Sequence, residues 1–220
     1  MDQEFLDRAL AWYGDAERVA ALVEARAAFV RATGEFGPRE PWWEERIAFF
    51  HDWFLLLYLL PDGRAPLRRF VDETRAGMTA AELEIYGDLL SVRHRSLFEV
   101  ERVRAGEVAL VDRIGRGSYS ASFDGPATGW GAGDLVDAIL LRRGRGLALS
   151  RGLVFHPRPA REAIVLLVEY ARTHRGGAPW DIVDLFARMK LAYERSETPR
   201  VAAIYTPESY LYREFVARAS

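Results

Sequence analysis

The amino-acid sequence predicts an α+β protein in which a helical region, a small β unit and a second helical region follow one another. Apolar residues recur every three or four positions up to about residue 92 and again after residue 157, as in amphipathic helices. Between these regions lie short runs rich in valine, phenylalanine and tyrosine, separated by glycines, as in successive antiparallel strands. With 220 residues, half of them hydrophobic, the chain can bury a sizeable core.

The N-terminal region is expected to be helical throughout. The predicted helices lie at 5–33, with a possible break at Gly14, and at 41–60, 66–73 and 80–92. The helix at 41–60 is apolar almost all round, so it should lie at the centre of the core. Thr79 and Glu82 have the spacing of a capping box, in which hydroxyl and carboxylate each accept from a free backbone amide at a helix start.

The β unit is expected to be a small antiparallel β-barrel or a bent meander of five to six strands. The predicted strands lie at 97–103, 107–113, 118–123 and 134–141, with one or two more within 147–155. Helices should follow at 159–173, at 180–193 and for a last turn or two within 208–218. We therefore divide the chain into a helical lobe (1–95), a β unit (96–157) and C-terminal helices (158–220), packed as one compact unit.

Composition excludes several kinds of site. The chain has no cysteine, so disulfides, thiolate metal sites and cysteine nucleophiles are ruled out, and we expect no cofactor. A net charge of −2 provides no global attraction to nucleic acid or anionic lipid. The N-terminal residues lack the basic-then-apolar layout of a secretory signal, and the longest apolar run, 47–60, is shorter than the roughly 20 residues of a membrane span. A cytoplasmic protein without a membrane partner is expected.

Three segments resemble a known group of proteins. They are FFHDWFLLLYLLPDGRAPLRRFVDE, SLFEVERVRAGEVALVDRIGRG and GDLVDAILL, in this order. Over about residues 45–145 the chain resembles the non-zinc portion of uncharacterised bacterial proteins that carry a SEC-C zinc motif. The resemblance implies an order of elements and a bacterial source, but no activity and no functional residue. The zinc motif itself is missing, since the chain has no cysteine.

No catalytic constellation can be recognised in the sequence. A Gly-x-Ser-x-Gly elbow does not occur, and the glycine-rich stretches 115–117 and 129–133 lack the strand–loop–helix setting of a phosphate-binding loop. Asp134 and Asp137 are three apart on a predicted strand, so their side chains should point to opposite faces. Glu44, Glu45 and His51 could share a helical face as metal ligands, but a polar stripe or a satisfied core pair is the favoured interpretation.

Trp130 is the first binding candidate. It lies in a glycine-rich loop, 124–133, where an aromatic side chain has little of its own chain to pack against. Aromatic residues in such places are enriched among interface hot spots. The alternative is that the indole caps the open end of the β unit.

The second binding candidate is an arginine cluster around a predicted hairpin. It consists of Arg142, Arg143, Arg145 and Arg151. Clustered arginines suit recognition of phosphate or carboxylate groups, although a solvated turn is the favoured interpretation. From these candidates we expect a non-enzymatic protein-interaction or scaffold protein whose partner is another protein. The alternative is a nucleic-acid-binding module that uses the β unit and the Arg142–Arg151 hairpin.

Overall fold

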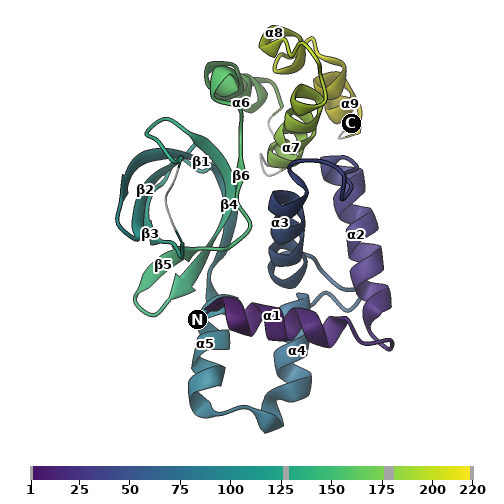
Figure 1. Ribbon diagram of the computed structural model, residues 1–220, viewed down its shortest axis with the longest axis vertical. Coiled ribbons are helices and arrows are strands. Elements are labelled where there is room, and N and C mark those ends of the chain that lie inside the picture. The colour runs from purple at the N-terminus through teal and green to yellow at the C-terminus, as the bar shows by residue number, and fades with distance from the viewer. Residues whose placement is uncertain (1, 126–128, 176–180, 219–220) are drawn as a thin grey trace.

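The α+β class is confirmed by the structure of the protein, a computed structural model that describes residues 2–125, 129–175 and 181–218. The strands curl into a ring on one side of the molecule (Figure 1). Helices α1–α3 lie on the other side, α4 and α5 lie below, and the C-terminal helices lie across the top (Figure 1). Helices therefore flank the strands from both ends of the chain.

The N-terminal helices occur where the sequence predicts them. They are α1 (Asp2–Tyr13), α2 (Val19–Thr33), α3 (Trp43–Leu56), α4 (Pro66–Thr74) and α5 (Ala80–Ser91), with a short 3-10 turn at Arg75–Gly77. The break at Gly14 is present, and the capping box at the start of α5 is confirmed, since Thr79 N donates to Glu82 Oε2 at 2.6 Å and Glu82 N donates to Thr79 Oγ1 at 3.3 Å. Helix α3 ends at Leu56, earlier than expected, and the chain then turns, with Gly63 N donating to Leu60 O.

The described residues form six strands, within the expected number. They are β1 (Arg93–Arg104), β2 (Glu107–Asp112), β3 (Ser118–Ser122), β4 (Leu135–Arg143), β5 (Gly146–Leu149) and β6 (Val154–Phe155). Neighbours pair in the order β1-β2-β3-β5-β4, and β4 pairs again with β1, so five strands close a ring. The short β6 pairs with β4 beside this ring.

One pairing differs from the antiparallel unit that the sequence predicts. Strands β3 and β5 run parallel and meet only through Ser122 and Ala148, so the sheet is mixed. Topology explains the difference: a ring with an odd number of strands cannot alternate in direction all the way round. At least one neighbouring pair must therefore be parallel, and here it is the shortest one.

The long strand β1 pairs with two neighbours in the ring. Its first half pairs with β4 and its second half pairs with β2, and the register shifts between Val100 and Arg102. A bulge of this kind bends a strand and increases its twist, which allows β1 to take part in both pairings.

The C-terminal region is helical, as expected. After a 3-10 turn at Arg158–Ala160 come α6 (Arg161–Arg175), α7 (Asp181–Glu194), α8 (Val201–Ile204) and α9 (Tyr210–Arg218). None of the described helices is both long enough and apolar enough to cross a membrane.

Strand β4 is shared by the apolar clusters of the described residues. Val136, Ala138 and Leu140 point into the ring, whereas Ile139 and Leu141 pack against the N-terminal helices. Leu135 belongs to a further cluster with the C-terminal helices. Because seven successive residues of β4 are buried, the three regions of the chain are packed onto one strand.

The centre of the N-terminal cluster is α3, as predicted. The buried apolar side chains on this helix are Phe49, Phe50, Phe54, Leu55 and Leu56. The ring of Phe54 is fully buried and contacts Tyr13 of α1 edge to face, with centroids 4.9 Å apart.

Candidate functional site

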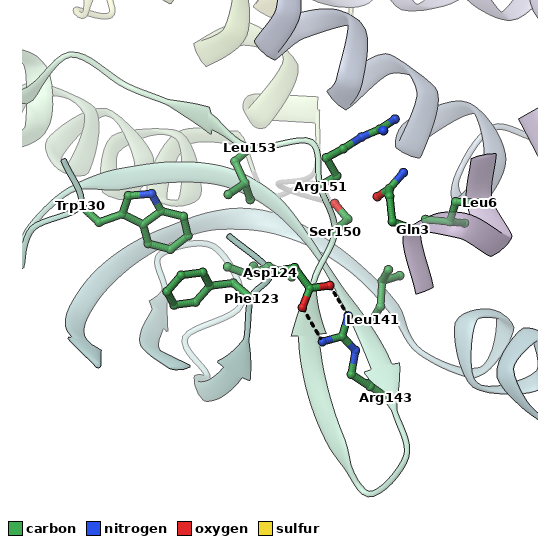
Figure 2. Close-up of a pocket in the computed structure, with 11 residues that line it drawn as sticks. Gln3, Leu6, Phe123, Asp124, Trp130, Leu141, Arg143, Ser150, Arg151 and Leu153 are labelled. Carbon is green, nitrogen blue, oxygen red and sulfur yellow. Dashed lines mark hydrogen bonds and ion pairs between the residues drawn. The ribbon is translucent and has the colours of Figure 1, made fainter. Parts of the chain in front are cut away.

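A cavity opens where strands β3 and β5 separate. The two strands meet only at Ser122 and Ala148, and the residues that follow them line a cavity of about 300 Å³. We call this cavity the Trp130 pocket; its main lining residues are Gln3, Phe123, Trp130, Arg143, Arg151 and Leu153. Figure 2 shows these side chains arriving from the ring, from the chain after β5 and from α1. Three predicted binding residues, Trp130, Arg143 and Arg151, thus meet at one place.

Trp130 is packed against the end of the ring and also lines the pocket. Its indole stacks on Phe123, with centroids 4.8 Å apart and planes 23° apart, and contacts Phe155 edge to face at 5.1 Å. The residue is half-buried and packs against the apolar cluster inside the ring. The indole therefore packs at the end of the β unit, as in the alternative interpretation. It also borders a cavity that a ligand could enter.

Arg143 is held in place by a carboxylate. Its two terminal nitrogens lie 3.2 and 2.8 Å from the two carboxylate oxygens of Asp124, as the dashed lines in Figure 2 mark. Hydrogen bonding from this guanidinium lowers the pKa of Asp124 below its ordinary value. A bidentate pair of this kind fixes the orientation of both side chains at the pocket wall.

Arg151 is held more loosely at the rim. Its Nη1 lies 3.4 Å from Asp7 Oδ1 on α1, and Gln3 Nε2 donates to the same oxygen at 3.0 Å. The side chains of Arg151 and Asp7 are 41% and 52% exposed. Exposed single contacts of this length contribute about 0–1 kcal/mol, so Arg151 can exchange partners at little cost.

Arg142 and Arg145 lie outside the Trp130 pocket. Arg142 Nε donates to the carbonyl of Gly144 at 3.0 Å and lies 3.6 Å from Asp88 of α5. Arg142 lines a second cavity, of about 570 Å³, that shares Arg143 and Asp124 with the Trp130 pocket. Arg145 is exposed at the hairpin turn and forms no hydrogen bond or ion pair within the described ranges. The arginine cluster predicted from the sequence is thus divided between two cavities and solvent.

The other acidic candidates do not line the Trp130 pocket. Glu45 lies 2.9 Å from Lys190 Nζ and links α3 to α7, although burial raises its pKa. Glu44 is exposed and His51 is half-buried, and in the described part of the chain no three His, Cys, Asp or Glu side chains are grouped as metal ligands. Asp134 and Asp137 do not form a pair either: Asp134 bonds Arg158, and Asp137 bonds Arg95.

Sequence reasoning missed three residues of the pocket region. Gln3 and Asp7 come from α1, and Asp124 follows β3. In the sequence, each of them is an ordinary polar residue. No local spacing distinguishes them, because only the packing of α1 beside the ring brings them to the pocket.

His156 is a buried histidine outside the pocket. It follows β6, is 5% exposed, and lies edge-on to Phe186 of α7 with ring centroids 6.1 Å apart. Neither ring nitrogen has a hydrogen-bond partner among the described residues. Burial, together with the positive charges of Lys190 and Arg95, lowers the pKa of His156 to about 3. The folded protein therefore keeps this imidazole neutral.

This histidine should make the protein less stable in mild acid. Below about pH 6.5 the unfolded chain protonates His156 but the folded chain does not, so the free energy of unfolding falls by about 1.4 kcal/mol per pH unit. We expect a loss of about 2 kcal/mol at about pH 5 that is absent in His156→Leu. Urea unfolding of both proteins near neutral pH and near pH 5 measures this difference, and His174→Gln, at an exposed site, is the control. Equal pH dependence in the parent and His156→Leu would contradict the prediction.

Comparison of the chain with protein-family models, with curated proteins and with solved structures gave no match. The resemblance to SEC-C-motif proteins therefore stays a prediction from the sequence.

Proposed function

We propose that this chain is a non-enzymatic protein-interaction or scaffold protein that binds a partner protein at the Trp130 pocket. One observation carries the proposal: Trp130, Arg143 and Arg151 line the same cavity. The proposal includes the bacterial, cytoplasmic setting that the sequence predicts.

The composition of the pocket supports binding rather than catalysis. Tryptophan and arginine are the residues that most often dominate binding energy at interfaces. The walls combine apolar side chains with a few polar groups, the pattern of sites that hold a ligand in one orientation. The nearby carboxylates of Asp124 and Asp7 each lie beside an arginine, as in a charge-matched binding surface.

Affinity capture tests this function. The tagged protein is incubated with nuclease-treated lysate of its native organism, the captured protein is identified, and binding is repeated with purified components. We expect Trp130→Ala to weaken binding about tenfold or more, as hot-spot truncation commonly does, and Arg145→Gln to leave it unchanged. Because Trp130 also packs on Phe123, Leu153→Ala serves as a second pocket variant whose folding is checked by circular dichroism. Equal capture by the parent and both pocket variants would exclude the pocket as the binding site.

The nucleic-acid alternative is opposed by the charges around the hairpin. Three of its four arginines lie beside carboxylates: Arg142 beside Asp88, Arg143 beside Asp124, and Arg151 beside Asp7. Single-stranded nucleic acids are bound by cationic grooves with aromatic side chains for base stacking. The outward residues of β2 and β3 are instead small or acidic, and Ser120 Oγ donates to Glu107 there at 2.6 Å.

We therefore expect no tight binding of single-stranded RNA or DNA. Each arginine that contacts a phosphate displaces about one counterion, so genuine binding would weaken steeply with salt. A salt titration compares the parent with an Arg142→Gln, Arg143→Gln and Arg145→Gln triple variant. Binding at micromolar concentration or tighter in physiological salt, with a slope that the triple variant flattens, would replace the protein-interaction proposal with the nucleic-acid one.

A further inference from the structure

We propose that the ligand of the Trp130 pocket is an extended acidic segment of the partner protein. An apolar side chain of this segment enters the pocket, and a neighbouring aspartate or glutamate carboxylate replaces Asp7 as the ion-pair partner of Arg151. The inference rests on the proposed function and specifies the chemistry of the partner.

The two arginines of the pocket differ in what they can offer a ligand. Arg143 uses both terminal nitrogens on Asp124, so its charge is already matched. Arg151 makes one contact of 3.4 Å with Asp7. A guanidinium can form two parallel hydrogen bonds with one carboxylate, and no carboxylate of the described residues makes that paired contact with Arg151. The rim therefore has one arginine that an incoming carboxylate can engage more fully than Asp7 does.

Asp7 shows which chemistry the rim accepts. Its Oδ1 accepts a hydrogen bond from Gln3 Nε2 at 3.0 Å and lies 3.4 Å from Arg151 Nη1, so a carboxylate of the chain itself already lies between these two groups. A ligand carboxylate at this place would meet the same two donors. Asp7 is thus an internal competitor, and removing its charge should strengthen binding of an acidic ligand.

The apolar part of the pocket limits the size of the anchor. Trp130 and Phe123 are stacked and form one wall, and Leu153 lines the same pocket. A cavity of about 300 Å³ is at the lower end of the range for ligand sites, and holds one or two side chains. A short segment of chain therefore fits, with its anchor between the indole and Leu153.

The second cavity gives the bound segment a direction. It lies beyond the Arg143–Asp124 pair, and its charged lining residues are Glu84, Asp88 and Asp124 against Arg142 and Arg143. Carboxylates therefore outnumber arginines there, whereas in the Trp130 pocket Arg143 and Arg151 outnumber the one carboxylate, Asp124. The acidic residue of the segment should therefore lie on one side of the anchor only.

Selection from a library of random peptides displayed on phage, with the full chain as bait, tests the inference. We expect the enriched peptides to pair a large apolar side chain with aspartate or glutamate one or two positions away, always on the same side. For the best peptide, synthesised with a fluorophore, Arg151→Gln should weaken binding about tenfold and Asp7→Asn should strengthen it several-fold. Arg145→Gln, an exposed arginine outside the pocket, is the matched control and should change nothing.

Three outcomes would overturn the inference. The first is enrichment of apolar or basic peptides that lack an acidic residue; if these still depend on Trp130, the proposed function stands and only the acidic specificity falls. The second is an affinity that Arg151→Gln and Asp7→Asn leave unchanged. The third is no enrichment by the parent, together with self-association in sedimentation that Trp130→Ala abolishes, which would identify a second copy of this chain as the occupant. Arg151 and Asp7 are exposed, so their variants should fold like the parent.

Discussion

Gly152→Ala should destabilise the protein by about 3 kcal/mol, the upper end of the usual cost of overpacking, because the atoms that the new methyl group meets cannot move aside. Gly152 lies against α3, and a Cβ atom there would come within 2.3 Å of Phe49 Cα and 2.7 Å of Phe49 N. These are backbone atoms of a helix, so no side-chain rotation relieves the clash.

The contact between Gly152 and α3 also includes a hydrogen bond to a buried carboxylate. The amide of Gly152 donates to Asp52 Oδ2 on α3 at 2.6 Å, and burial raises the pKa of Asp52 to about 6. Any shift that makes room for a Cβ at Gly152 would lengthen this hydrogen bond and leave a buried polar group without its partner. The steric and polar costs therefore add to each other.

Urea unfolding of Gly152→Ala and Gly87→Ala measures the effect. Gly87 lies in α5, and a Cβ there would meet nothing within 4 Å, so alanine should stabilise that helix by about 0.5–1 kcal/mol. The two glycine-to-alanine changes should thus act in opposite directions. A loss below about 0.5 kcal/mol for Gly152→Ala, typical of surface substitutions, would show that the chain after β5 does not press on α3 as described.

Asp137→Ala should cost about 3–5 kcal/mol, because it leaves a buried arginine without its main partner. Arg95 Nε and Nη2 donate to the two oxygens of Asp137 at 3.0 and 2.7 Å, and Nη1 donates to Asp184 at 2.6 Å. Burial alone would lower the pKa of Arg95, but the two carboxylates raise it above its ordinary value. Because an arginine side chain is not deprotonated in proteins, the guanidinium stays charged when Asp137 is removed.

The two partners of Arg95 provide a matched control. The side chain of Asp184 is 28% exposed and that of Asp137 is 1% exposed, so Asp184→Ala should cost much less. An Arg95→Met and Asp137→Leu double variant should recover most of the lost stability, since apolar side chains can replace a buried ion pair with little loss. Equal losses for Asp137→Ala and Asp184→Ala in thermal unfolding would contradict the assigned roles.

The sequence by itself determined most of the secondary structure. The helix break at Gly14, the capping box of Thr79 and Glu82, and the short strands β2 and β3 occur as predicted. Each depends on residues only a few positions apart, because helical hydrogen bonds, caps and the alternation of strand faces are local. Such features can be recognised without knowing where the rest of the chain lies.

Only the tertiary structure decided how these elements meet. The odd-numbered ring required a parallel contact between β3 and β5, and the pocket formed where that contact ends. Trp130 and two of the arginines could be singled out by residue type, but their grouping with Gln3 required α1 to pack beside the ring. Arg151 and its partner Asp7 likewise lie more than a hundred positions apart in the sequence, and Gly152 lies about a hundred positions from its partner Asp52. The physical reason is that burial and charge pairing depend on which surfaces come into contact, and the spacing of nearby residues does not predict those surfaces.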